Sequence, residues 1–121
     1  MKRGPASDRV LLLHIHECLR RIAEYTQASR STFFETPLVQ DAVVRNLQTL
    51  AESTQRLSET AKASQPQVPW AEIAGFRNVI THGYLGLDLA VVWSVVEQDL
   101  PGLSRAIDTM LDQKGDSTRQ P

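Results

Sequence analysis

The 121-residue sequence lacks several features that define other protein classes. A single cysteine, Cys18, excludes an internal disulfide and fits a reducing compartment. No apolar run is long enough to span a bilayer. The short run from Val10 to Leu13 is followed at once by His14, which is unlike a signal peptide. We therefore expect a cytoplasmic protein.

An excess of charge of either sign is also missing, because 13 lysines and arginines stand against 14 aspartates and glutamates. A global positive field that would attract nucleic acid is therefore absent, and any RNA binding requires a local basic patch. Gly-rich phosphate loops, paired catalytic carboxylates and Ser-His-Asp arrangements are not found in the sequence either. These absences exclude several common enzyme types.

Most of the sequence has the apolar spacing of helices. Its length fits one domain over residues 1–121. We expect a flexible arm over residues 1–6 and a disordered tail over residues 114–121, which has no apolar side chain. A first helix, capped by Ser7 or Asp8, has an apolar seam that consists of Leu11, Ile15, Cys18, Ile22 and Tyr25. Together these patterns predict an all-α fold.

The later helices are marked by their caps and prolines. Thr36 and Pro37 begin a second helix whose apolar face extends to Ala61, after a connector over residues 29–35 that tucks its phenylalanines against the bundle. Pro69 begins a third helix, and Asp88 caps the last one. Because Pro101 lacks a backbone N–H, we expect a kink or a restart there.

Cys18 and His14 are four residues apart and can reach one metal ion, but two ligands do not make a zinc site and no second pair completes it. We therefore predict no metal and no cofactor, with Cys18 as a small core residue. Arg20 and Arg21 are adjacent on the first helix. Such a pair usually belongs to the solvated surface, and the alternative is an RNA-binding patch.

The segment from Arg77 to Tyr84 gathers groups that can handle a phosphate. Arg77 presents a planar fork of donors that matches two phosphate oxygens. His82 can take and give a proton near neutral pH. Asn78, four residues before His82, can hydrogen-bond one imidazole nitrogen and fix which nitrogen carries the proton.

Arg77 and His82 do not converge on a regular helix, because five residues at about 100° each separate them by roughly 140°. We expect the helix to stop at Gly83, since glycine readily takes the left-handed conformation at that position. Convergence therefore requires a distorted last turn, a second subunit across a two-fold axis, or both.

The stretch Arg77-Asn78-Val79-Ile80-Thr81-His82-Gly83-Tyr84 resembles the Arg-x4-His-x-Tyr signature of the HEPN superfamily, specifically the HepT-like ribonuclease toxins. The resemblance extends over most of the chain, through Val68-Pro69-Trp70 before the motif and Leu87-Asp88, Trp93 and Asp99-Leu100-Pro101 after it. It implies a four- to five-helix up-down bundle that dimerises, with two motifs meeting at the interface as a metal-independent endoribonuclease site.

By the same resemblance, Arg77 and His82 are catalytic, Asn78 supports them, and the RNA substrate is tRNA or mRNA. Tyr84 is similar to the tyrosine that a cognate minimal nucleotidyltransferase antitoxin of the MntA type modifies with AMP. The alternative is a structural role, in which Tyr84 packs against the helices and closes the bundle. The chain departs from the family pattern at Ala51-Glu52, where many members have Gly-Glu.

Three residues of the second helix have open roles. Arg45 extends the phosphate-binding surface or pairs with Asp41 or Glu52. Glu52 supports the active site through an arginine or lies in such a surface pair. Asn46, on the apolar side, is a polar hook between helices or a half-exposed flanking residue.

Two further interpretations of the motif compete with the nuclease. In one, the chain is a non-catalytic helical module that binds a nucleotide or a partner nucleotidyltransferase through Arg77 and His82. In the other, His82 caps the carbonyls at a helix end and Arg77 pairs with a carboxylate.

Overall fold

The computed structural model describes the backbone of residues 5–76 and 88–119 and the side chains of residues 7–76 and 88–113. Every element in these ranges is helical, as predicted, and none of these helices is long and apolar enough to cross a membrane. The elements are α1 (Pro5–Thr26), α2 (Arg30–Glu35), α3 (Pro37–Arg56), α4 (Glu59–Ala63), α5 (Trp70–Ala74), α7 (Leu89–Ser94), the π-helical turn η1 (Val95–Asp99) and α8 (Leu100–Arg119).

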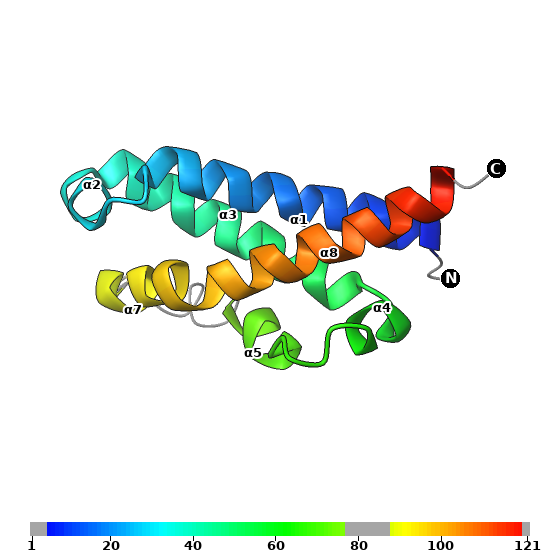
Figure 1. The fold of residues 1–121 in the computed structure, drawn as a ribbon. Helices are drawn as coiled ribbons and strands as arrows, with labels where there is room; N and C mark the ends of the chain where they lie inside the picture. The colour runs from blue at the N-terminus through cyan, green and yellow to red at the C-terminus, as the bar shows by residue number, and fades with distance from the viewer. Residues whose placement is uncertain (1–4, 77–87, 120–121) are drawn as a thin grey trace.

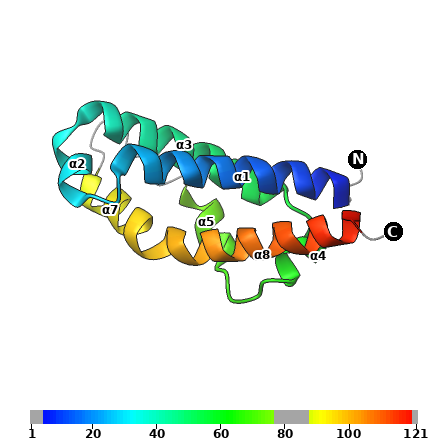
Figure 2. The same ribbon diagram turned by 45° about the horizontal axis from the view of Figure 1, so that its top comes forward.

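Three long rods lie side by side: α1, α3, and the continuous run of α7, η1 and α8 (Figures 1 and 2). The first rod runs antiparallel to the other two and packs against both α3 and α8. Helix α2 joins α1 to α3 at the end where α7 begins, and α8 finishes beside the start of α1 (Figure 1). Helix α5 packs against α3.

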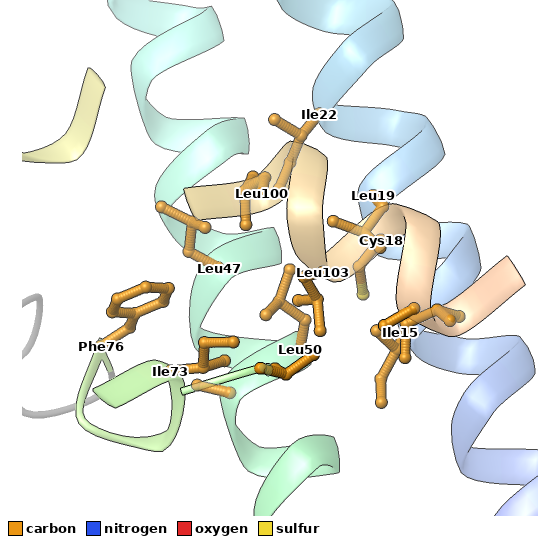
Figure 3. Close-up of a cluster of buried hydrophobic side chains, with 14 of the residues drawn as sticks. Ile15, Cys18, Leu19, Ile22, Leu47, Leu50, Ile73, Phe76, Leu100 and Leu103 are labelled. Atoms are coloured by element: carbon orange, nitrogen blue, oxygen red, sulfur yellow. The ribbon is translucent and has the colours of Figure 1, made fainter. Parts of the chain in front are cut away.

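Apolar side chains from all three rods form one buried cluster, part of which is shown in Figure 3. The predicted seam of α1 is confirmed at Ile15, Cys18 and Ile22, whereas Leu11 is only half-buried. Leu12 and Leu19 are buried as well. The buried face of α1 is wider than the predicted apolar seam because α1 packs against two helices, α3 and α8.

The connector expected over residues 29–35 is instead the short helix α2. The Ser29 hydroxyl caps it by accepting a hydrogen bond from the Thr32 backbone N–H at 3.2 Å. Phe33 is fully buried and stacks on Trp93 of α7, with ring centroids 5.4 Å apart. The predicted packing of this segment is therefore confirmed, although its conformation differs.

The second helix ends at Arg56 and does not continue to Ala61, because Leu57 is extended and Ser58 starts α4 as its N-cap. Asp8 holds this turn. The Ser58 backbone N–H and hydroxyl donate to the two carboxylate oxygens of Asp8 at 2.9 and 2.7 Å. Asp8 therefore does not cap α1, which already begins at Pro5.

The interruption expected at Pro101 is a π-helical turn immediately before it. Without an N–H, Pro101 cannot join the regular hydrogen-bond ladder, and a π turn is one way to absorb that defect. The chain continues through it as α8 to Arg119, so the backbone of residues 114–119 is helical. Adding a residue to an existing helix is much easier than starting one.

Candidate functional site

The predicted catalytic segment lies outside the described residues. Arg77, Asn78, His82 and Tyr84 all fall within residues 77–87, so their predicted geometry stays a prediction. The structure does place the two ends of this segment, Phe76 and Asp88, and the surfaces around them. These surroundings are where a substrate that reached the motif would also make contact.

The chain enters the motif from α5, which is anchored in two ways. The Trp70 indole N–H donates to the backbone oxygens of Lys62 and Gln65, at 3.0 and 3.1 Å. Ile73 and Phe76 are buried in the core, where Figure 3 places them beside Leu50 and Leu47 of α3. Phe76, the residue before Arg77, is therefore held in the core.

The chain leaves the motif at Asp88, which caps α7 as predicted. Its Oδ1 accepts hydrogen bonds from the backbone N–H groups of Ala90 and Val91, at 3.0 and 3.4 Å. Val92 and Trp93 of α7 are buried, with Trp93 against the phenylalanines of α2. The residues on both sides of the predicted catalytic segment are thus attached to the core.

A cavity of about 270 Å³ lies between these two attachments. Its apolar walls come from Leu47, Phe76 and three valines of α7 and η1, and two carboxylates, Glu72 and Asp99, also line it. Sequence reasoning missed this site. Residues 72–76 and 91–99 are brought together only by packing, and no local pattern shows that.

A second, more polar cleft of about 480 Å³ lies where the end of α3 meets α4 and α5. Trp70 and Lys62 line it, but the Lys62 ammonium is 3.3 Å from a carboxylate oxygen of Glu59. Its only described cation is therefore already paired, which makes this cleft a weaker candidate for binding an anion.

Arg20 and Arg21 are held by carboxylates of their own helix. Glu17 accepts from Arg20 at 2.8 Å and from Arg21 at 3.1 Å, and Arg20 also contacts Glu24 at 2.8 Å. The hydrogen bonds from Arg20, with those from Arg21, lower the pKa of Glu17 to about 2. This network favours the surface ion-pair role of the two arginines over phosphate contact.

Arg45 is exposed on α3 and has no carboxylate within ion-pair range in the part of the chain that the structure describes. The predicted pairing with Asp41 or Glu52 is thus not formed there, and phosphate contact by Arg45 stays a prediction. Glu52 is exposed as well. Ala51, the neighbour of Glu52, is fully buried in the core.

Asn46 is half-exposed, and its amide donates to the Ala42 carbonyl of the same helix at 2.8 Å. The flanking role, and not a hook between helices, is therefore the one the structure supports. On α1, His14 hydrogen-bonds through Nδ1 to the Ser53 hydroxyl at 2.9 Å. Cys18 is 2% exposed, and burial raises the pKa of its thiol. Among the described residues no group of three metal-ligating side chains is found.

Comparison with known proteins decides the family. A family model described as "Ribonuclease HepT-like" matches residues 15–110, a range that includes the whole Arg77 to Tyr84 segment. The chain belongs to the HepT-like ribonuclease family. The similarity to HepT-like proteins that the motif indicated is thereby confirmed.

Several HepT-like relatives align along most of this chain. "Probable ribonuclease HepT" of Thermococcus cleftensis is 35% identical over 85% of this chain and 92% of its own length. "Putative RNase MJ1380" of Methanocaldococcus jannaschii is 27% identical over 83% of this chain and 93% of its own length.

A longer relative from the same organism, "Gamma-glutamylcyclotransferase and putative RNase MJ0434", is 31% identical over 87% of this chain, which covers 48% of that protein. No solved structure shows a significant match to the chain.

Proposed function

We propose that this HepT-like chain is a metal-independent endoribonuclease that cleaves tRNA or mRNA, with Arg77 and His82 as its catalytic residues. One observation carries the proposal: the family match over residues 15–110 encloses a complete Arg-x4-His-x-Tyr motif. The relatives named as ribonucleases support it.

The chemistry follows from the two side chains. The His82 imidazole takes the proton from a ribose 2′-hydroxyl, and that oxygen attacks the adjacent phosphorus. A bond forms between the 2′ oxygen and phosphorus while the bond to the 5′ oxygen breaks, and an imidazolium returns a proton to that oxygen. Arg77 stabilises the extra negative charge on the phosphoryl oxygens. The products are a 2′,3′-cyclic phosphate and a 5′-hydroxyl.

A homodimer suits this mechanism. One histidine can take the first proton while the second subunit's histidine gives the other, and a two-fold axis brings two motifs together as one site. Asn78 positions His82 by holding one ring nitrogen, which fixes the nitrogen that carries the proton.

Regulation is the second part of the proposal. A cognate minimal nucleotidyltransferase antitoxin transfers AMP from ATP to the Tyr84 oxygen and releases pyrophosphate. The attached AMP adds negative charge and bulk beside Arg77, which repels an RNA phosphate. Intact mass after co-expression with such an enzyme tests this step: we expect an added AMP that is absent from Tyr84→Phe, and an unmodified Tyr84 contradicts it.

Digestion of RNA by the purified protein tests the catalytic proposal. We expect cleavage that persists in EDTA and falls at least about 100-fold in either Arg77→Ala or His82→Ala, because each variant removes general base catalysis or charge stabilisation. Arg56→Ala, an exposed arginine at the end of α3, is the matched control and should keep activity. RNA binding without cleavage would indicate the non-catalytic module instead, and loss of activity in EDTA would contradict the metal-free mechanism.

A further inference from the structure

We propose that the cavity between α5 and α7 binds one nucleobase of the RNA, beside the cleaved phosphate, and selects a base that carries an exocyclic amino group. This inference rests on the proposed ribonuclease function and adds a specificity site to it. The site consists of Phe76, Val91, Val92 and Val95 as apolar walls, with Glu72 and Asp99 as polar groups.

Its position in the chain ties the cavity to the catalytic segment. Phe76 is covalently linked to Arg77, and consecutive Cα atoms are about 3.8 Å apart. On the other side, Val91 lies three residues after Asp88, the first described residue beyond the segment. A nucleotide whose phosphate is held by Arg77 therefore has its base within reach of this cavity.

The size and walls of the cavity fit a base and not a phosphate. About 270 Å³ is near the lower end of the range for small-molecule pockets, which suits a single planar ring system. An aromatic ring and branched aliphatic side chains give the face of a base an apolar surface. Two carboxylates, in contrast, repel a phosphate. The 43% exposure of Val91 leaves one side of the cavity open to a ligand.

Glu72 and Asp99 explain the expected choice of base. Carboxylate oxygens act as hydrogen-bond acceptors, and adenine, cytosine and guanine present an exocyclic amino group that donates to them. Uracil has carbonyl oxygens in place of an amino group, which a carboxylate repels, and only its ring N3–H can donate. Within the ranges that the structure describes, neither carboxylate has an ion-pair or hydrogen-bond partner from the protein. Asp99 is the last residue of the π-helical turn, a rare element that is frequent at functional sites.

The test uses the full chain and DNA oligonucleotides that contain a single ribonucleotide, so that only one linkage has the 2′-hydroxyl needed for cleavage. The base on each side of that linkage is varied among the four. We expect kcat/KM about tenfold higher for an amino-bearing base than for uracil at one of the two positions, the discrimination of one good base contact. Inosine lacks the amino group of guanosine, and purine riboside lacks that of adenosine. Either replacement should therefore remove the higher kcat/KM.

Protein variants identify the cavity as the source of the preference. Glu72→Gln and Asp99→Asn exchange one acceptor oxygen for a donor and should lower the preference to about threefold or less, as expected for a weakened base contact. The matched control is Glu97→Gln, an exposed carboxylate on the same π turn outside the cavity, which should keep the full preference. Far-ultraviolet circular dichroism checks that each variant is folded.

Equal cleavage with all four bases, or a preference that survives both cavity variants, overturns the proposal and leaves the cavity to another occupant, such as a lysine side chain of a protein partner. If the wild-type chain cleaves none of the oligonucleotides, the proposed function fails separately. Fluorescence anisotropy of the same labelled oligonucleotides then decides the cavity inference. A binding preference for amino-bearing bases that Glu72→Gln removes supports it, and equal binding overturns it.

Discussion

Asp8 is a buried carboxylate, 3% exposed, that links the first helix to the start of α4. Its two oxygens accept both donors of Ser58, whose hydroxyl in turn accepts from the Ala61 backbone N–H at 3.0 Å. One acidic side chain therefore supports a helix cap 50 residues away in the sequence. Hydrogen bonds to a charged group of this kind contribute more than neutral ones.

Asp8→Ala should lower the free energy of unfolding by about 2–3 kcal/mol, because it leaves the Ser58 N–H without its acceptor in a half-buried place. Asp8→Asn keeps one acceptor oxygen and should cost about half as much. Urea unfolding followed by circular dichroism measures both. Asp41→Ala, at an exposed position of α3, is the control and should change stability by less than about 0.5 kcal/mol. An equally small effect of Asp8→Ala would show that water replaces the carboxylate without loss.

At the scale of the element, the turn from α1 to α2 contains two residues in the left-handed region, Gln27 with φ 52° and Ala28 with φ 54°. The backbone N–H of Gln27 donates to the Ala23 carbonyl at 2.9 Å, and the N–H of Ser29 donates to the Thr26 carbonyl at 2.8 Å. The turn therefore supplies hydrogen-bond donors to carbonyls at the end of α1. A residue with a Cβ is strained in this region, whereas glycine is not.

Ala28→Gly should therefore raise the free energy of unfolding by about 0.5–1 kcal/mol, since relief of roughly 1–2 kcal/mol exceeds the extra entropy that glycine loses on folding. The control, Ala23→Gly, is an exposed helical position in the same helix and should lower stability by about 1 kcal/mol. Thermal unfolding of both variants should thus give Tm shifts of opposite sign. Two shifts in the same direction would mean that the turn relaxes in solution.

The π turn η1 is an element with two consequences. It absorbs the break that Pro101 introduces, and it sets Val95 and Asp99 along the wall of the cavity next to the catalytic segment. A regular helix turns about 100° per residue, so a wider turn rotates every later side chain relative to the earlier ones. The register of α8 against α1 thus depends on this one turn.

For the whole molecule, the proposed dimer raises the question of how two copies share an active site. One version of the dimer has two sites, each with the arginine of one subunit and the histidine of the other, and that single histidine serves as both base and acid. In this version a dimer of one Arg77→Ala chain and one His82→Ala chain retains one intact site. Random mixing makes half of the dimers mixed, so refolding the two inactive variants together should restore about a quarter of wild-type activity.

The control for this experiment is each variant refolded alone, which should stay inactive. Activity that fails to return on mixing, with mixed dimers verified by native mass spectrometry, contradicts a site shared in this way. It would mean either that Arg77 and His82 of one site are on the same chain or that one site needs the histidines of both subunits.

The fold was predictable to the extent that it depends on local patterns. Apolar spacing located the three long rods and their buried faces, including Ile15 on α1 and Val43, Leu47 and Leu50 on α3. Helix ends were less predictable. Ser58 ends one helix and starts another because a carboxylate from residue 8 holds it, and such a distant contact leaves no local pattern.

The sequence by itself determined the helical class, the family and the residues proposed for catalysis, because helical periodicity and the Arg-x4-His-x-Tyr motif are both local in the chain. Only the tertiary structure decided that Arg20 and Arg21 are held by Glu17, and that Glu72 and Asp99 share a cavity with Phe76. Those pairings depend on rotamers and on the packing of α5 against α3 and of α7 against α2, which residue spacing does not specify.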